Sequence, residues 1–348
     1  MKSVLQRLHT RRLLPRARAS IDRLPVTAPP PDRRTRLAIA AAFGLVAAGY
    51  VLARAHAYVA WGADIDQSWA GALALRAGAD PYVAVGPTGT FLRWPWPLFY
   101  PLPALLLALP LTAFPMVAAR AVFLGMSSAW LAYGLTRQGY WSLALFGSAA
   151  YLGALAIGAW EPLLVAAALT PGGVPVYLAK PNVGLALASA LPFRRATLVG
   201  LAVACALVAI SVAVRPTWIG EWLNALRGGT HLAGPITRVG GILVLAALTK
   251  WRRAEARLLV AMASVPQTMF LQAALPLFLV ARSRAEILLL ALLSYVPYAI
   301  QLHAAAQNIA FQESTRRTGD AIALCLYLPC VVLVLRRPNV WTTLGERP

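Results

Sequence analysis

Acidic residues are scarce in this sequence. Only 12 of its 348 residues are Asp or Glu, against 32 Lys or Arg, and charged residues of both signs make up 13% of the chain. An ordinary soluble domain is roughly 25% charged and about 45–50% apolar, whereas 59% of this chain is hydrophobic and its mean hydropathy is +0.64. The shortage of charge therefore argues against a water-soluble domain and predicts an integral membrane protein.

Cysteine is also rare, and nucleotide-binding signatures are missing. The chain's three cysteines, Cys205, Cys325 and Cys330, each lie in an apolar run. We therefore expect buried thiols rather than a disulfide framework or a metal cluster. The sequence has no glycine-rich loop of the kind that cradles nucleotide phosphates. We predict no metal ion and no cofactor.

Long apolar stretches dominate what is present. From residue 37 almost to the end, runs of about 17–25 residues recur, which is the length that crosses a hydrocarbon core of about 30 Å. Lipid cannot satisfy backbone amides, so such runs must be helical, and the short alternating strands of a membrane barrel are not seen. We predict an all-α polytopic protein of about ten to twelve transmembrane helices, with spans at about 37–60, 98–113, 117–136, 140–157, 181–193, 196–214, 236–250, 256–281, 285–303 and 319–335.

Three further segments have ambiguous patterns. Residues 161–180 are interrupted by a Pro-Gly-Gly sequence at 171–173, which predicts either one kinked span or a re-entrant hairpin. Residues 256–281 are either one span or a broken pair. Residues 67–77 alternate small apolar and polar residues, which is typical of a helix lying at the membrane interface.

The net charge of +20 is distributed as the positive-inside rule requires. Basic residues concentrate in residues 1–36 and in short clusters at 194–195, 250–253, 282–284 and 336–337. We predict a disordered basic cytoplasmic tail at 1–36, a transmembrane domain at 37–337 whose long outer loop is 61–97, and a cytoplasmic tail at 338–348. The predicted location is a bacterial inner membrane, where membrane lipids are the surrounding partners. No soluble basic module is present, so we expect no nucleic-acid partner.

The candidate chemistry lies mainly in the outer loop. Asp64 and Asp66 follow the first predicted span, where a carboxylate beside a cavity can act as a general base toward a hydroxyl. They are equally interpretable as solvated acids near a helix start. Asp80-Pro81-Tyr82 after Gly78 is a turn signature that either shapes a substrate site or is a plain loop turn.

Isolated cations are the second group of candidates. Lys180 precedes a proline between two apolar runs, where a lysine is costly unless it lies at an interface or in a cavity and pairs with a phosphate. A lysine that snorkels to the lipid headgroups would have the same pattern. Arg93, in the outer loop, has the same two interpretations.

Taken in order, these residues resemble a known family. Asp66, Trp69 and the stretch Leu75–Tyr82 are similar to an outer-loop pattern of an acid, an aromatic and Leu-x-x-Gly-x-(Asp/Asn)-Pro-Tyr. Tyr100-Pro101-Leu102-Pro103 is similar to a Tyr-Pro-Pro-Leu helix start, and Gly158–Leu164 to a Gly-Gln-x-Asn-x-Leu-Leu element. Lys180-Pro181 then precedes an apolar run that closes on arginines. The family is the polyprenyl-phosphate-dependent GT-C glycosyltransferases of the mannosyltransferase type, glycosyltransferase family 87.

The resemblance covers roughly residues 60–215, and the chain departs from the pattern at two places. Ala159 stands where the family has glutamine. A later Ser-Pro-x-x-Trp-x-His element is matched only by Ser264–Leu271, which has no histidine, so no histidine role is carried over.

The resemblance implies a GT-C-like fold and a lipid-linked sugar donor that enters from the bilayer. An outer aspartate, Asp66 in the preferred match with Asp64 in support, would deprotonate the acceptor hydroxyl for inverting attack at the anomeric carbon. The partners would be a polyprenyl-phosphate sugar donor and a lipid or glycan acceptor. Residues at the matching positions that are expected to bind substrate are Lys180, Tyr82, Trp69, Asp80 and Glu161. Arg93 is expected to bind substrate as an isolated cation of the outer loop.

Two other classes of function remain open at this point. A transporter or flippase of a lipid-linked sugar or small solute would also have cavity charges and broken helices, but would carry polar residues near mid-helix. A structural membrane subunit without chemistry would not need Asp66. The gathering of polar residues in the outer loop favours the enzyme.

Overall fold

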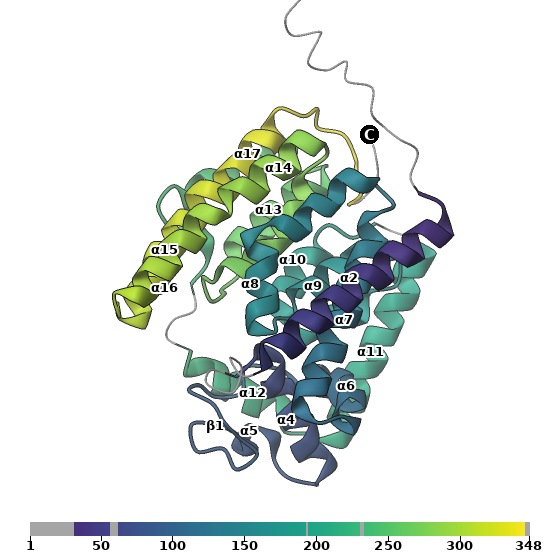
Figure 1. The fold of residues 1–348 in the computed structure, drawn as a ribbon, viewed down its shortest axis with the longest axis vertical. Helices are drawn as coiled ribbons and strands as arrows, with labels where there is room; N and C mark the ends of the chain where they lie inside the picture. The colour runs from purple at the N-terminus through teal and green to yellow at the C-terminus, as the bar shows by residue number, and fades with distance from the viewer. Residues whose placement is uncertain (1–30, 56–61, 193, 230–232, 345–348) are drawn as a thin grey trace, which may run out of the picture.

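The computed structural model describes residues 31–55, 62–192, 194–229 and 233–344. Within these ranges almost all regular structure is helical (Figure 1). The strands β1 (Val85–Gly86) and β2 (Leu92–Arg93) form one short parallel pair. The predicted all-α class is therefore confirmed for the described part of the chain.

Five helices among the described residues are long and apolar enough to cross a membrane. A helix of 20 residues is about 30 Å long, which matches the hydrocarbon core. Two of the five, at Arg284–Ala306 and Phe311–Leu335, are each built from successive helical segments, and the latter contains a π-helical turn. The five are α2 (Arg33–Ala53), α7 (Met116–Leu135), α11 (Arg195–Val214), α14 (Arg284–Leu293) with α15 (Tyr295–Ala306), and α16 (Phe311–Ile322) with η7 (Ala323–Tyr327) and α17 (Leu328–Leu335).

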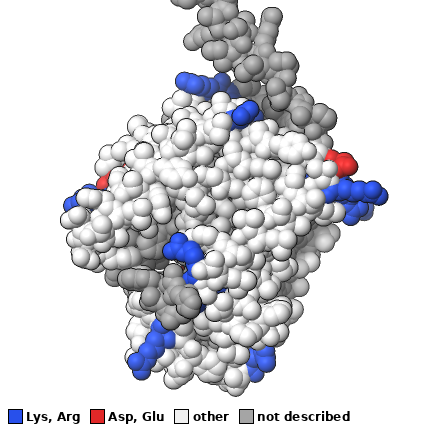
Figure 2. All heavy atoms as spheres, viewed as in Figure 1, with Lys and Arg blue, Asp and Glu red and all other residues white. Residues whose placement is uncertain are grey.

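The surface of these helices is that of an integral membrane protein. Large apolar side chains such as Leu45 on α2 and Leu198 on α11 are exposed, and contiguous exposed apolar surface of this kind marks contact with lipid or protein. Figure 2 shows one face of the molecule as almost entirely uncharged, with only a few basic and acidic side chains.

The predicted ten to twelve crossings compare with five helices of spanning length among the described residues. A sixth span results if η2 (Tyr140–Gly147) and α8 (Ala149–Ile157), which bend by 59°, are taken together. The remaining apolar runs form short helices, because prolines and glycines interrupt them and neighbouring segments can satisfy the broken backbone inside the protein. These are α6 (Leu102–Ala108), η1 (Leu109–Ala113), α9 (Glu161–Ala168), η3 (Val174–Ala179), α10 (Pro181–Ala188), η5 (Gly241–Lys250), α13 (Ala254–Ser264) and η6 (Leu271–Val280).

The two broken segments can now be assigned. In residues 161–180, helices α9 and η3 pack against each other, and Lys180 after η3 meets Glu161 at the start of α9. The segment is thus a hairpin rather than one kinked span. Residues 256–281 are a broken pair, α13 and η6, separated by a non-helical connection.

The outer-loop prediction also needs correction in detail. The first helix ends at Ala53 rather than residue 60, and residues 56–61 lie outside the described chain. The expected interfacial helix is α4 (Asp64–Arg76), but most of its residues are buried against the bundle, so it does not lie freely on a surface. It is followed by the single turn α5 (Pro81–Ala84) and the strand pair.

Glycines allow close helix packing between α2 and α7. A β-carbon on Gly44 would lie 2.9 Å from the carbonyl oxygen of Gly125, and one on Gly125 would lie 3.1 Å from the carbonyl oxygen of Gly44. Small residues at such contacts let helix backbones approach in membranes, where no hydrophobic effect drives helices together. The glycine contact therefore holds α2 directly against α7.

The basic clusters meet at one end of the bundle, where the described chain also begins and ends (Figure 1). Arg36 near the start of α2 donates to the Tyr133 carbonyl near the end of α7 (2.6 Å). At the same end, the fully buried Glu255 receives hydrogen bonds from four side chains, which are those of Arg253, Arg282, Arg337 and Thr342. The opposite end carries α4, α5, the strands and α12 (Trp218–Arg227).

This two-ended arrangement predicts the orientation in the membrane. In a cysteine-free background, we expect an impermeant maleimide to label Val83→Cys on α5 in intact cells. Arg284→Cys at the basic end should react only after lysis, because basic clusters stay cytoplasmic. Both side chains are exposed, so accessibility does not bias the comparison. The reverse labelling pattern would contradict the assigned orientation.

Candidate functional site

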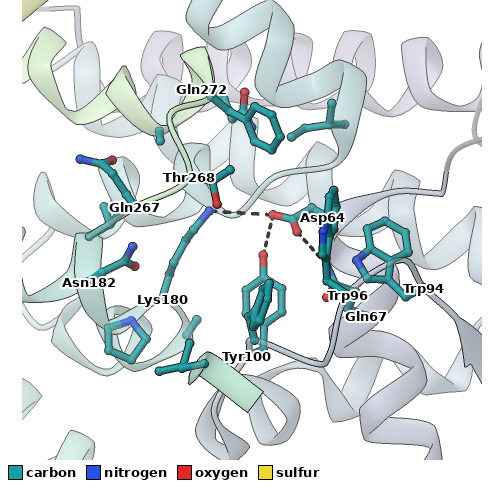
Figure 3. A pocket seen from close by; sticks show the side chains of 18 of the residues that line it. Asp64, Gln67, Trp94, Trp96, Tyr100, Lys180, Asn182, Gln267, Thr268 and Gln272 are labelled. Carbon is teal, nitrogen blue, oxygen red and sulfur yellow. Dashed lines mark hydrogen bonds and ion pairs between the residues drawn. The ribbon is translucent and has the colours of Figure 1, made fainter. Parts of the chain in front are cut away.

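A cavity of about 590 Å³ opens at the end of the bundle that carries α4 (Figure 3). Its volume lies within the range of about 300–1,000 Å³ that is typical of small-molecule sites. The walls combine aromatic side chains with a few polar and charged ones. The lining residues used below are Arg54, Asp64, Gln67, Trp94, Trp96, Phe99, Tyr100, Lys180, Pro181, Asn182, Val183, Trp222, Gln267, Phe270 and Gln272.

The start of α4 is fixed against the end of α8. Gly158, which terminates α8 with a φ of +68°, accepts a hydrogen bond on its carbonyl oxygen from the amide of Ile65 (3.0 Å). A β-carbon on Gly158 would lie 2.7 Å from the β-carbon of Ala63, so this close approach requires glycine. The two contacts set where the first turn of α4 begins.

Asp66 lies inside the protein and does not line the cavity. Its two carboxylate oxygens pair with Nε and Nη2 of Arg120 on α7, each at 2.6 Å, and one also accepts from the Ala63 amide at 2.6 Å. Both Asp66 and Arg120 are buried. A carboxylate held by three donors has little freedom to accept a proton from a substrate, so the geometry favours Asp64 over the sequence-based choice of Asp66 as the base.

Asp64 is the aspartate that reaches the cavity. Its carboxylate accepts from the Tyr100 hydroxyl (2.5 Å) and the Gln67 amide (3.0 Å), and Lys180 Nζ lies 3.9 Å away (Figure 3). Burial raises the pKa of Asp64, and the nearby carboxylate of Glu161 adds to this, whereas Lys180 opposes it. An aspartate with a raised pKa at a cavity wall is suited to general-base chemistry near neutral pH.

Lys180 lies between two carboxylates. Its ammonium group donates to Glu161 Oε1 at 2.6 Å, in addition to facing Asp64. Glu161 is fully buried, and its other carboxylate oxygen has no hydrogen-bond partner among the described residues. The three side chains together carry one net negative charge when all are ionised, so the ammonium is already balanced before any anion enters.

Of the six residues predicted to bind substrate, only Lys180 lines the cavity. Glu161 is buried behind Lys180, and four more lie outside the cavity wall. The Trp69 indole donates to the Leu111 carbonyl (3.2 Å), and the Tyr82 hydroxyl donates to the Tyr100 carbonyl (3.3 Å). Arg93 is exposed and does not line the cavity. The fourth is Asp80, treated next.

Asp80 and α12 form a bridge outside the cavity. Arg215 at the end of α11 pairs with Asp80 and, through Nε (2.6 Å) and Nη2 (2.8 Å), with Glu221 on α12. The hydrogen bonds from Arg215 lower the pKa of Glu221. The bridge holds α12 where Trp222 of that helix lines the cavity and donates to the Phe99 carbonyl (2.9 Å). Asp80 therefore acts on the cavity only indirectly, through Arg215 and the position of α12.

Sequence reasoning missed several residues of the cavity wall. Tyr100 was identified only as part of a helix-start motif, and Gln67 was given no site role, although both donate hydrogen bonds to Asp64. The amides Asn182, Gln267 and Gln272 were not predicted as site residues either. Isolated polar residues within apolar runs are costly in lipid unless they face a cavity. That signal could have identified Gln272, which is buried among the apolar residues of η6.

Comparisons with known proteins give no family. Neither models of protein families, nor curated proteins, nor solved structures match this chain. Among the described residues, no group of three or more His, Cys, Asp or Glu side chains is placed to hold a metal ion. The functional argument therefore depends on the cavity itself and on the sequence resemblance.

The contrast between the two aspartates predicts opposite effects on stability. Asp66→Asn leaves the buried Arg120 without its counter-charge, and removal of one partner from a buried pair typically costs about 3–5 kcal/mol. Asp64→Asn should change stability little or increase it, because burial already raises the pKa of Asp64 and so favours a neutral side chain. Thermal unfolding in nanodiscs measures both. Equal unfolding temperatures for the two variants would contradict the assignment.

Proposed function

We propose that this protein is a membrane-embedded inverting glycosyltransferase. It moves a sugar from a polyprenyl-phosphate donor to a lipid or glycan acceptor at the outer face of a bacterial inner membrane. The observation that carries the proposal is Asp64, a partly buried carboxylate with a raised pKa that faces a cavity of about 590 Å³ at the end opposite the basic clusters. The sequence resemblance supplies the reaction class.

The acceptor hydroxyl would lie against Asp64. Gln67 and Tyr100 each occupy one lone pair on a different carboxylate oxygen, so further lone pairs remain to accept the acceptor's proton. As the proton moves to Asp64, the acceptor oxygen forms a bond to the anomeric carbon. The bond from that carbon to the phosphate oxygen breaks, its electron pair leaves with the polyprenyl phosphate, and the sugar's configuration inverts.

The leaving phosphate needs a positive environment that is fixed in advance. Lys180 lines the cavity at the start of α10, and Pro181, Asn182 and Val183 of the first turn of that helix line it as well. Unpaired amides at a helix N-terminus favour an anion. Because Glu161 and Asp64 already balance Lys180, the net positive charge for the phosphate comes from Arg54, which lies at the end of α2 and lines the same cavity.

Aromatic side chains complete the fit to a sugar. Trp94, Trp96 and Phe270 line the cavity with the amides of Gln267 and Gln272. Aromatic faces suit the apolar C–H face of a sugar ring, and amides both donate to and accept from hydroxyls. A purely apolar solute would leave these amides unpaired, which disfavours it.

The transfer assay separates the roles of the two aspartates. We expect Asp64→Asn to lower transfer from a polyprenyl-phosphate sugar by about 10²–10⁴-fold, which is the typical contribution of a general base. Asp66→Asn protein that remains folded should retain far more activity, because Asp66 does not reach the cavity. If Asp66→Asn is inactive while folded and Asp64→Asn is active, the base is Asp66. If the wild type transfers no sugar from any lipid donor, a transporter or a structural subunit becomes the better account.

The pH dependence of transfer gives a second test. Asp64 must be ionised to accept a proton, and burial raises its pKa above the ordinary value of about 3.9 for aspartate. Activity should therefore fall as the pH is lowered through an apparent pKa above that value, and this acid limb should be absent from the residual activity of Asp64→Asn. An identical acid limb in the variant would assign it to another group.

A further inference from the structure

A second cavity lies at the basic end and shares no lining residue with the cavity of Asp64. It has a volume of about 230 Å³ and forms where the turn between α9 and η3 meets the first turn of α11 and the C-terminal segment. It is lined by two exposed arginines, Arg137 and Arg194, and no Asp or Glu of the described chain lines it. The electrostatic environment of this cavity therefore favours an anion.

The start of α11 points its backbone donors at this cavity. The first N–H groups of a helix have no partner within the helix, and the side chain of Arg194, the residue that precedes the helix, makes no capping hydrogen bond. Arg194 and Thr197, on either side of these first amides, both line the cavity. The dipole of a 20-residue helix adds further preference for negative charge at this position.

Two buried side chains with unpaired hydroxyls give an independent indication of a ligand. Tyr177 is 5% exposed and Thr197 is 7% exposed, and both line the cavity. Neither hydroxyl has a hydrogen-bond partner among the described residues. Thr343 Oγ1, in the C-terminal segment at the cavity, is a buried oxygen that also lacks a partner there. Polar groups of buried side chains are normally hydrogen-bonded, so unpaired hydroxyls on two buried side chains of one cavity indicate a missing acceptor-rich group.

We propose that this cavity binds a phosphate group, either as the headgroup of an anionic phospholipid or as free phosphate. Phosphate offers several acceptor oxygens to hydroxyls, amides and guanidinium groups at once. Among the described residues, the Arg137 guanidinium donates one hydrogen bond, to the Leu169 carbonyl at 3.3 Å, so it retains donors for an anion. Basic pockets between helices at the cytoplasmic side are known to suit anionic headgroups.

The site is independent of the proposed sugar transfer. The residues that line it belong to segments at the end of α7, the α9–η3 turn, the start of α11 and the C-terminal segment, and none of them lines the cavity of Asp64. A bound phosphate would join these segments by bridging Arg137, Thr197 and Thr343. Its expected effect is therefore on affinity for anionic lipid and on thermal stability.

The test uses the full chain in nanodiscs of phosphatidylcholine, with phosphatidylglycerol or inorganic phosphate added as the probe. Native mass spectrometry measures retained lipid, and thermal unfolding measures stabilisation by either probe. We expect Arg137→Gln to weaken phosphatidylglycerol binding about tenfold, because hydrogen bonds to charged groups are the strong ones. Arg284→Gln, an exposed arginine at the same end that does not line the cavity, is the matched control and should change binding less than about twofold.

A conservative variant separates binding from folding. Thr197→Val keeps the side-chain shape but removes the hydroxyl, and should weaken binding about three- to tenfold without lowering the unfolding temperature in phosphatidylcholine alone. Stabilisation by millimolar inorganic phosphate without anionic lipid would identify free phosphate as the ligand. Stabilisation by phosphatidylglycerol alone would identify the lipid headgroup. Equal binding by wild type, Arg137→Gln and Thr197→Val, or equal losses in Arg137→Gln and Arg284→Gln, would overturn the proposal.

Discussion

The ion pair between Asp66 and Arg120 determines which of two neighbouring aspartates reaches the cavity. Successive residues of an α-helix are about 100° apart, so residues two positions apart point in nearly opposite directions. With Asp66 turned inward to α7, Asp64 must turn outward, toward Tyr100 and Lys180. The hydrogen bond from the Ile65 amide to the Gly158 carbonyl also fixes the first turn of α4, by attaching it to the end of α8. The position of the candidate base therefore depends on contacts made by its neighbours.

The sequence predicted the membrane class and the position of several long helices, because hydropathy acts locally. Helices α7 and α11 begin and end within about one residue of the expected spans. The number of spanning helices among the described residues was overestimated. Hydropathy alone cannot distinguish an apolar run that crosses the lipid from an apolar run that packs inside the protein as a short helix. Pro276 within η6 and the Pro-Gly-Gly turn at 171–173 mark such interruptions, but not how the pieces pack.

The choice between Asp64 and Asp66 could not be made from the sequence. It depends on Arg120, which lies 54 residues away and is the only charged residue of α7, and motif spacing contains no information about that contact. The pairing of Lys180 with Glu161 was likewise hidden, because it requires the hairpin of α9 and η3 to close. Local patterns thus located the segments that form the site, whereas long-range ion pairs determined the role of each side chain.

The central claim is that the sugar donor and Asp64 share one cavity. Electron cryomicroscopy of Asp64→Asn in nanodiscs, with a polyprenyl-phosphate sugar bound and not turned over, tests this directly. The account predicts the sugar beside residue 64, its phosphate near Lys180 and the start of α10, and Asp66 still paired with Arg120. Donor density elsewhere on the protein, or an Asp66 released from Arg120 and in contact with the sugar, would contradict it.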